Sequence, residues 1–157
     1  MLYDQNIPKE EMIEYAKKIL KERGYKKKGT RWTKAEGEFT ISFYLQGSSY
    51  APGTYYIRPG IFLNAVESDD HYGHFFTEIE QTDVERVMQE FDAFVREWTD
   101  KELVKKAVAD FLEWDKRNPL SKRQANLVDF ANDPPPTRVL LTAHLHTTLM
   151  PYIMENF

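Results

Sequence analysis

The sequence predicts an α+β fold, in which a small antiparallel β-sheet of three to four strands packs against an N-terminal helix and several C-terminal helices. Residues 38–64 have the pattern of two strands joined by a turn, and the segments on both sides have the periodicity of helices. The chain has 157 residues, a length that suits one domain. We therefore expect a single α+β domain over residues 1–157, with the first helix and the sheet in residues 1–81 and a helical part in residues 82–157.

The first helix is predicted from Pro8 to Arg23. Pro8 suits a first helical turn, where its missing N–H would be unpaired in any case. Gly24 can end the helix. Apolar residues with a 3.6-residue period form one stripe along it. These residues are Met12, Ile13, Ala16, Ile19 and Leu20.

The segment 26–34 combines basic and aromatic residues. They are Lys26, Lys27, Lys28, Arg31, Trp32 and Lys34. We favour a helix-to-strand connection whose lysines keep an edge strand from pairing with another molecule. The alternative is a site for single-stranded nucleic acid, with phosphates held by the cations and a base stacked on Trp32. No nucleic-acid motif accompanies the segment, so nucleic-acid binding is disfavoured.

Alternating apolar and polar residues predict the central strands. In the first strand the core-facing residues are Phe39, Ile41, Phe43 and Leu45. The second strand runs from Thr54 to Leu63, and Pro59-Gly60 interrupts it, so we expect a bulge or an edge position there. Residues 75–80 can add another short strand.

Helical periodicity begins after residue 81, and three capping-box spacings predict helix starts. They are Thr82 with Glu85, Thr99 with Glu102, and Ser121 with Gln124. Asn118-Pro119 and the prolines at 134–136 end the second and third of these helices.

A last helix is predicted within residues 137–157. Leu141, Leu145 and Leu149 recur four residues apart, and Pro151 should kink or end the helix. Because this segment is so apolar, it can be a core helix or a docking element for another chain. The sequence leaves both possibilities open.

The outward face of the central strands is the best candidate for a binding surface. It offers Ser42, Tyr44 and Gln46 from the first strand and Tyr56 and Arg58 from the second, and the loop that follows adds Asp69, Asp70 and His71. Such groups can bind a partner or ligand without a large desolvation cost. The alternative is an ordinary solvent face, or a face covered by the C-terminal helices.

Catalytic and metal motifs are missing from the sequence. There is no P-loop, dinucleotide fingerprint or G-x-S-x-G elbow, and with no cysteine there is no thiolate site. His71 and His74 lie near Asp69 and Asp70 but lack the spacing of a known metal site. His144 and His146 would point to different faces of a helix. We therefore predict no metal and no cofactor, and we favour a non-enzymatic role.

Charge is distributed unevenly along the chain. Residues 1–63 carry a net charge of +4, residues 64–133 carry −8 and residues 134–157 carry 0. The acidic part would suit a basic protein partner, although the simpler explanation, which we favour, is that Glu and Asp solvate the helix surfaces. The N-terminus has no signal-peptide pattern and no apolar run approaches the roughly 18 residues of a membrane span. We expect a cytoplasmic protein that does not engage a membrane.

Residues 8–63 resemble the bacterial domain-of-unknown-function family numbered 4304. The resemblance rests on three segments, GYKKKGTRW after the first helix, FTISFYLQGSS, and TYYIRPGIFL. Ile57 to Ile61 stand where the family has an Asn-Leu-Gly type of sequence. The resemblance implies no agreed enzymatic role. Similar small proteins occur beside bacterial polymorphic toxins, which implies immunity to a toxin as one function.

Three functional hypotheses follow. The first is a protein-binding module, in its finer form an immunity-like protein that neutralises a basic, toxin-like partner. The second is a small-molecule or nucleotide-binding protein, with a possible enzymatic role, that uses Tyr44, Arg58 and the loop of His71 and His74. The third is single-stranded nucleic-acid binding by the segment 26–34.

Overall fold

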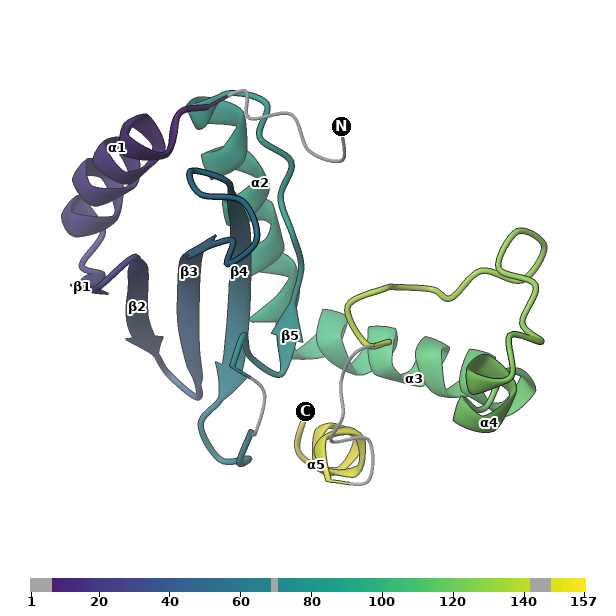
Figure 1. Cartoon of the computed structure of the whole chain (residues 1–157). Helices are drawn as coiled ribbons and strands as arrows, with labels where there is room; N and C mark the ends of the chain where they lie inside the picture. Colours follow the sequence, from purple (N-terminus) through teal and green to yellow (C-terminus); the bar gives the residue numbers. More distant parts are fainter. Residues whose placement is uncertain (1–6, 69–70, 142–147) are drawn as a thin grey trace. The chain divides into compact units, whose positions relative to one another are not determined.

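The structure, a computed structural model, describes residues 7–68, 71–141 and 148–157 (Figure 1). It divides into two compact units, Met1–Thr99 and Asp100–Phe157, which are described separately below. The helix after residue 81 belongs to the first unit, together with the sheet. That the two units together form one domain stays a prediction.

The first unit contains a five-stranded antiparallel sheet and two helices, which confirms the α+β class. The strands follow one another in the sheet in chain order, β1-β2-β3-β4-β5. The elements are α1 (Lys9–Glu22), β1 (Lys26–Lys28), β2 (Arg31–Glu36), β3 (Phe39–Gly47), β4 (Tyr55–Leu63), β5 (Phe75–Phe76) and α2 (Val84–Trp98). The prediction of three to four strands was one short, because the lysine-rich β1 pairs with β2 as a separate edge strand.

One face of the sheet packs against α1 and α2 and forms the core of the unit (Figure 1). Phe43 of β3 contacts Phe91 of α2 with ring centroids 5.0 Å apart, and Phe75 contacts Trp98 at 4.8 Å. From α1 the buried residues are Met12, Ala16 and Leu20. Each large apolar side chain buried here contributes about 1.5–3 kcal/mol. The four core-facing residues predicted for β3 are all buried.

Pro59 and Gly60 lie inside the sheet, so the expected bulge or edge position is wrong. The β3–β4 register continues through Phe43 and Pro59 without an extra residue. Antiparallel hydrogen-bonded pairs alternate along a strand. Asn64 N–H donates to the Glu38 carbonyl, so the even-numbered residues of β4 direct their backbone bonds toward β3 and the odd-numbered residues direct theirs toward β5. Pro59 is odd-numbered, and its carbonyl accepts from Thr77 N–H. Pro59 has no N–H to return that bond. The β4–β5 ladder is therefore interrupted after Phe76, and pairing resumes only at an isolated bridge between Ile57 and Ile79.

Gly60 lets the loop before β5 lie directly on the open face of the sheet. A Cβ at Gly60 would be 1.7 Å from the Tyr72 carbonyl oxygen. The next loop residue, Gly73, has φ +130° and its Cα lies against the Ile61 backbone, where a Cβ would be 2.9 Å from the carbonyl oxygen. Only glycine is compatible with this approach.

We predict that Gly60→Ala lowers the free energy of unfolding by more than about 2 kcal/mol, because the new methyl group would displace the Tyr72 backbone. Urea denaturation measures the change. Gly47→Ala in the neighbouring strand is the matched control. Its methyl would meet the flexible Lys9 ammonium at 3.3 Å, so we expect a change within about 0.5 kcal/mol. Equal losses in the two variants would contradict this role of Gly60.

The N-caps of α2 and α3 are residues next to those predicted. Asp83 is the N-cap, and its carboxylate accepts from Arg86 N–H at 2.9 Å. Thr99 ends the helix, and its hydroxyl donates to the Val95 carbonyl. The next helix is capped by Asp100, which accepts from Leu103 N–H. In each case aspartate stands beside the predicted threonine and provides the stronger, charged cap.

The second unit contains α3 (Lys101–Arg117), α4 (Leu120–Gln124) and α5 (Leu149–Asn156). α3 packs against α5. Four apolar residues on one face of α3 are buried, namely Val104, Val108, Phe111 and Trp114. Leu149, Met150 and Ile153 of α5 are buried as well. Asn118-Pro119 ends α3 as predicted, and α4 begins after Pro119 without a side-chain cap from Ser121.

The last segment differs in part from the predicted helix. α5 begins at Leu149 and continues through Pro151, which lies in its first turn, where a missing N–H is tolerated. Pro151 therefore neither kinks nor ends it. Residues 142–147, which include His144, Leu145 and His146, lie outside the described residues. In the described part Leu149, Met150 and Ile153 are buried while Met154 is exposed, and docking to another chain stays a prediction.

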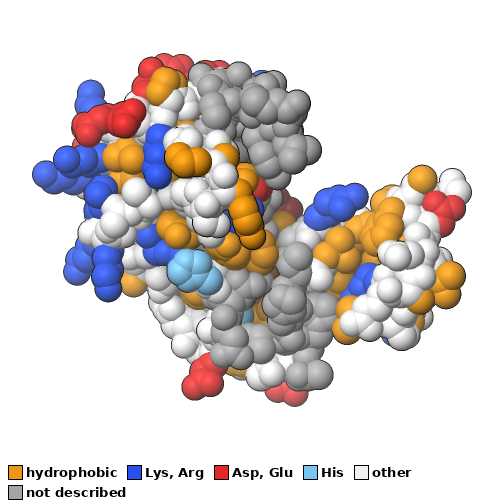
Figure 2. Space-filling model, in the orientation of Figure 1, with side chains coloured by type: hydrophobic (Ala, Val, Ile, Leu, Met, Phe, Trp, Pro, Cys, Tyr) orange, Lys and Arg blue, Asp and Glu red, His pale blue; other side chains and the backbone are white. Residues whose placement is uncertain are grey.

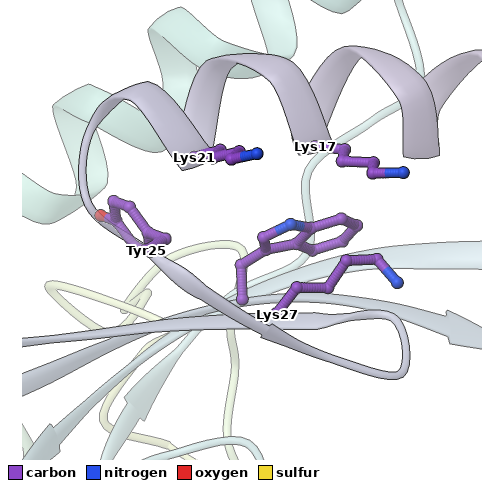
Figure 3. A pocket seen from close by; sticks show the side chains of 5 residues that line it. Lys17, Lys21, Tyr25 and Lys27 are labelled. Carbon is purple, nitrogen blue, oxygen red and sulfur yellow. The ribbon is translucent and has the colours of Figure 1, made fainter.

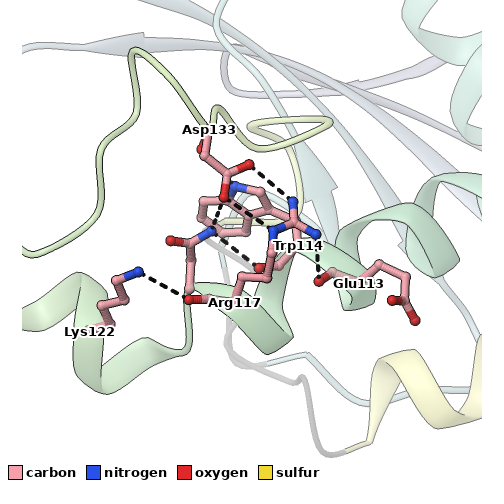
Figure 4. A network of polar contacts seen from close by, with 6 residues as sticks. Glu113, Trp114, Arg117, Lys122 and Asp133 are labelled. Carbon is pink, nitrogen blue, oxygen red and sulfur yellow. Dashed lines mark hydrogen bonds and ion pairs between the residues drawn. The ribbon is translucent and has the colours of Figure 1, made fainter.

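Asp133 connects the proline-rich loop to the end of α3 (Figure 4). Its carboxylate accepts from Arg117 at 3.0 and 3.3 Å and from the Asn118 amide at 2.8 Å. Its backbone carbonyl accepts from the Trp114 indole N–H at 2.8 Å. The hydrogen bonds from Arg117 and then Asn118 lower the pKa of Asp133.

We predict that carboxyl NMR titration gives Asp133 a pKa below the ordinary value of about 3.9. The stabilisation from Asp133 is then complete above that ordinary value and is lost as the pH falls through the lower, folded-state pKa. Arg117→Gln should raise this pKa, because it removes the main hydrogen-bond donor. Lys106→Gln, at the distinct pair with Asp110, should leave it unchanged. An unaltered Asp133 pKa in Arg117→Gln would refute the assignment.

No helix in the described ranges has both the length and the apolar character needed to cross a membrane.

Candidate functional site

The face of the sheet opposite α1 and α2 carries a cluster of arginine and aromatic side chains, here called the open-face cluster. Its members are Arg31, Ser42, Tyr44, Gln46, Tyr56, Arg58, His71, Tyr72 and Glu78. The strand residues reach one face because alternate side chains of a strand point to the same side and the register places Arg31, Tyr44 and Arg58 in one row. Figure 2 views this side of the molecule, with Lys and Arg side chains gathered toward the β1–β2 edge.

Arg31 organises the β2 side of the cluster. Its guanidinium donates to the Ser42 hydroxyl at 2.8 Å and to the His71 carbonyl at 3.0 Å. It also lies 4.2 Å from the centroid of the Tyr44 ring, a cation–π contact. Ser42 is fully buried beneath this arrangement. Arg31 therefore joins two strands to the loop before β5.

Arg58 organises the β4 side. Its guanidinium donates to the Gln46 amide oxygen and, at 3.0 Å, to the Tyr72 hydroxyl, which itself donates to Gln46 at 2.8 Å. It pairs with Glu78 at 3.2 Å. The Tyr56 and Tyr72 rings lie 4.7 and 5.1 Å from the guanidinium.

The electrostatics of the cluster are positive. Partial burial lowers the pKa of Arg31, against the opposing effect of Tyr44 and Tyr72. An arginine remains charged at neutral pH even so. The cluster thus combines two guanidinium groups with one carboxylate, Glu78. Arg58 and Glu78 keep 25% and 41% of their side-chain surface exposed, so both can reach a binding partner.

The loop that carries His71 and Tyr72 is held by backbone contacts. His74 is buried, and its Nδ1 accepts from Leu63 N–H at 2.9 Å. Its Nε2 lies 3.3 Å from the Glu67 carbonyl oxygen. With the close approach at Gly60, these bonds fix the loop on the sheet. His74 therefore has a structural role, while the exposed His71 belongs to the cluster.

The structure brings together six of the eight residues that the sequence singled out. Ser42, Tyr44, Gln46, Tyr56, Arg58 and His71 all lie in the open-face cluster. Asp69 and Asp70 lie outside the described residues. That these residues bind a partner or ligand stays a prediction.

Three further members were not found from the sequence. Arg31 was assigned to the basic segment 26–34, yet strand alternation separates it from Trp32, which is buried in the core at 1% exposure. Tyr72 depends on the close approach at Gly60, and Glu78 on the register between β4 and the residues after β5. The Pro59-Gly60 pair was the available signal, because glycine in a strand often marks a close backbone approach.

Within the residues that the structure describes, no three His, Cys, Asp or Glu side chains gather in a way that could hold a metal ion. The chemistry that the open-face cluster offers is hydrogen bonding and stacking. Its arginines are donors for carboxylate or carbonyl oxygens, and its tyrosine rings are platforms for apolar or planar groups.

Residues 16–125 match the family described as Domain of unknown function (DUF4304). The chain belongs to the DUF4304 family. No curated protein and no solved structure matches it.

The DUF4304 match extends well beyond the residues 8–63 in which the resemblance was seen. It covers all five strands, α2, α3 and α4, and it includes every member of the open-face cluster. The family membership predicted from the strand segments is confirmed, and it reaches into the second unit. The helical residues carry family signal even though they show no short motif.

We predict that Tyr72→Phe lowers the free energy of unfolding by about 1–2 kcal/mol, because it removes the hydroxyl shared by Arg58 and Gln46. Urea denaturation provides the measurement. Tyr50→Phe is the matched control, since Tyr50 is 98% exposed and should change stability by less than about 0.5 kcal/mol. If both variants were equally stable, the network would not support the cluster.

Proposed function

We propose that the protein is a non-enzymatic protein-binding module that recognises its partner through the open-face cluster. The observation that carries this proposal is the grouping of Tyr44, Tyr56 and Tyr72 with Arg31 and Arg58 on the sheet face opposite the helices of the unit. Tyrosine and arginine dominate the energetics of protein interfaces. The partner supplies carboxylate or carbonyl oxygens to the guanidinium groups.

Preorganisation supports this role. Both guanidinium groups are already oriented by neighbouring hydrogen bonds and aromatic rings, so binding would restrict few additional side-chain rotamers. Each side chain that must be immobilised on binding costs about 0.5–1.5 kcal/mol. A surface with this much internal order can therefore bind more tightly than a set of freely rotating side chains.

The finer form of the proposal is an immunity-like protein that neutralises a basic, toxin-like partner in the cytoplasm. The acidic residues of the chain support it, because a net charge of −8 over residues 64–133 would accelerate encounter with a basic protein. The absence of cysteine fits a reducing compartment. In this form the acidic residues of the segment 64–133 attract the partner electrostatically, and the open-face cluster contacts it directly.

The test is affinity capture from the cell of origin, followed by calorimetry on the purified pair. We predict that Tyr44→Ala and Tyr56→Ala each weaken binding by at least about tenfold, as truncation of interface tyrosines typically does. Tyr50→Ala, an exposed tyrosine in the turn between β3 and β4, should bind as the wild type does. A partner whose affinity is unchanged in both cluster variants would show that it binds elsewhere.

The immunity-like form has a separate test. Charge reversal at Asp69 and Asp70, or added salt, should weaken the complex with a basic partner, because both reduce electrostatic attraction. A complex indifferent to both would eliminate the acidic-surface form and leave the open-face proposal intact.

Binding of a small molecule or nucleotide is the second candidate. The observation that favours it is the convergence of Tyr44, Arg58 and His71 on one face of the sheet. His74, by contrast, is turned to the backbone. Saturable binding of a nucleotide that is abolished by Arg58→Gln would favour this candidate over the protein-binding role.

A further inference from the structure

A second, separate site lies between α1 and the β1–β2 edge of the sheet. A cavity of about 240 Å³ there is lined by Lys17, Lys21, Tyr25, Lys27 and Trp32. Figure 3 shows Lys17 and Lys21 extending from the helix and Lys27 from the strand on the other side of the cavity. None of these residues belongs to the open-face cluster.

The charged side chains that line this cavity are all lysines. Lys17 and Lys21 are four residues apart on α1, so they share one helix face, and Lys27 adds a third ammonium from β1. No carboxylate lines the cavity. None of the three lysines forms an ion pair with another residue of the described ranges.

Like charges at this spacing destabilise a helix slightly, and a third cation adds to the repulsion. An anion placed among them would relieve it. Lys21 is also in the last turn of α1, where the helix dipole favours a cation. The arrangement is therefore one that an anionic ligand stabilises.

The floor of the cavity is aromatic and neutral. Lys27 lies 5.6 Å from the Trp32 ring centroid, which holds its ammonium near the cavity. Burial, with a further contribution from Glu36, raises the pKa of Tyr25 to about 12. The Tyr25 hydroxyl therefore stays protonated at neutral pH and adds no negative charge.

The volume limits the size of the ligand. Sites for drug-sized molecules have volumes of about 300–1,000 Å³, so this cavity suits a smaller group. Since Trp32 is 1% exposed, its ring is not available to stack a nucleobase. A compact group with more than one negative charge makes the best use of three ammonium groups, and a phosphate monoester is such a group.

We propose that Lys17, Lys21 and Lys27 form a binding site for a phosphate monoester group. The group comes from a small phosphorylated metabolite or from a phosphorylated residue of a protein. Both sources present the same dianion to the same ammonium groups. The site is independent of the open-face cluster, so its failure would not affect the proposed function.

The test measures binding of inorganic phosphate and of O-phosphoserine by NMR at low ionic strength. The wild type should show saturable shifts centred on the Trp32 indole N–H and on the amides of Lys17 and Lys21. The double variant Lys17→Gln, Lys27→Gln should weaken binding by about tenfold or more, because it removes two charge-assisted contacts.

The matched control is the double variant Lys18→Gln, Lys28→Gln. These lysines are sequence neighbours of the cavity lysines, but they do not line the cavity. The net charge changes equally in the two double variants, so general attraction of anions falls equally. The control should bind phosphate within about twofold of the wild type, a difference well below the free energy of one charge-assisted contact.

Peptides distinguish the two sources. A phosphoserine peptide that binds more tightly than O-phosphoserine identifies a protein-borne group, whereas equal affinities identify a small metabolite. Either result supports the site. Equal weakening in the two double variants, or absence of saturable binding in the wild type, would overturn it.

Discussion

The close approach of the Tyr72 carbonyl to Gly60 is the contact on which the open face of the sheet depends. A sheet with helices on one face leaves the other face to solvent unless another segment covers part of it. Here the loop before β5 does so, because glycine at position 60 allows backbone to lie directly on backbone. His71 and Tyr72 then reach the arginines of β2 and β4. Without this contact the strands would present separate polar side chains instead of one network.

Different kinds of interaction therefore stabilise the two faces of the sheet. The helix-covered face is stabilised by burial of apolar area and tolerates hydrophobic exchange at constant volume. The open face is stabilised by directional bonds around two guanidinium groups, in which each lost partner leaves a polar group unsatisfied. Substitutions that are equivalent in size should thus have different consequences on the two faces. The open face is the one where geometry limits the choice of side chain most strictly.

The sequence predicted much of the fold, and it predicted which strand side chains share the open face but not which groups they contact. Strand alternation placed Ser42, Tyr44 and Gln46 on one face and Phe43 on the other, because a two-residue period needs no tertiary information. The partners of those side chains required the register between strands, which depends on how β2 and β5 pair. Arg31 is an example. In the sequence it is one of several cations in the segment 26–34, and only the strand register shows that it lies beside Tyr44 in a row across the sheet. The predicted N-caps of α2 and α3 were wrong by one residue. At each helix start a threonine is followed by an aspartate, and the aspartate forms the cap.

Pro59 has a dynamic consequence. Because it cannot donate a bond to Thr77, the β4–β5 ladder is far shorter than the nine-residue ladder between β3 and β4. Short ladders open at a lower free-energy cost than long ones, so β5 can detach while the rest of the sheet remains paired. The loop with His71 and Tyr72 is continuous with β5. Hydrogen exchange at the open face is thus coupled to β5, a strand of two residues. A ligand that holds the loop against Arg31 and Arg58 would slow exchange at Phe75 and Phe76.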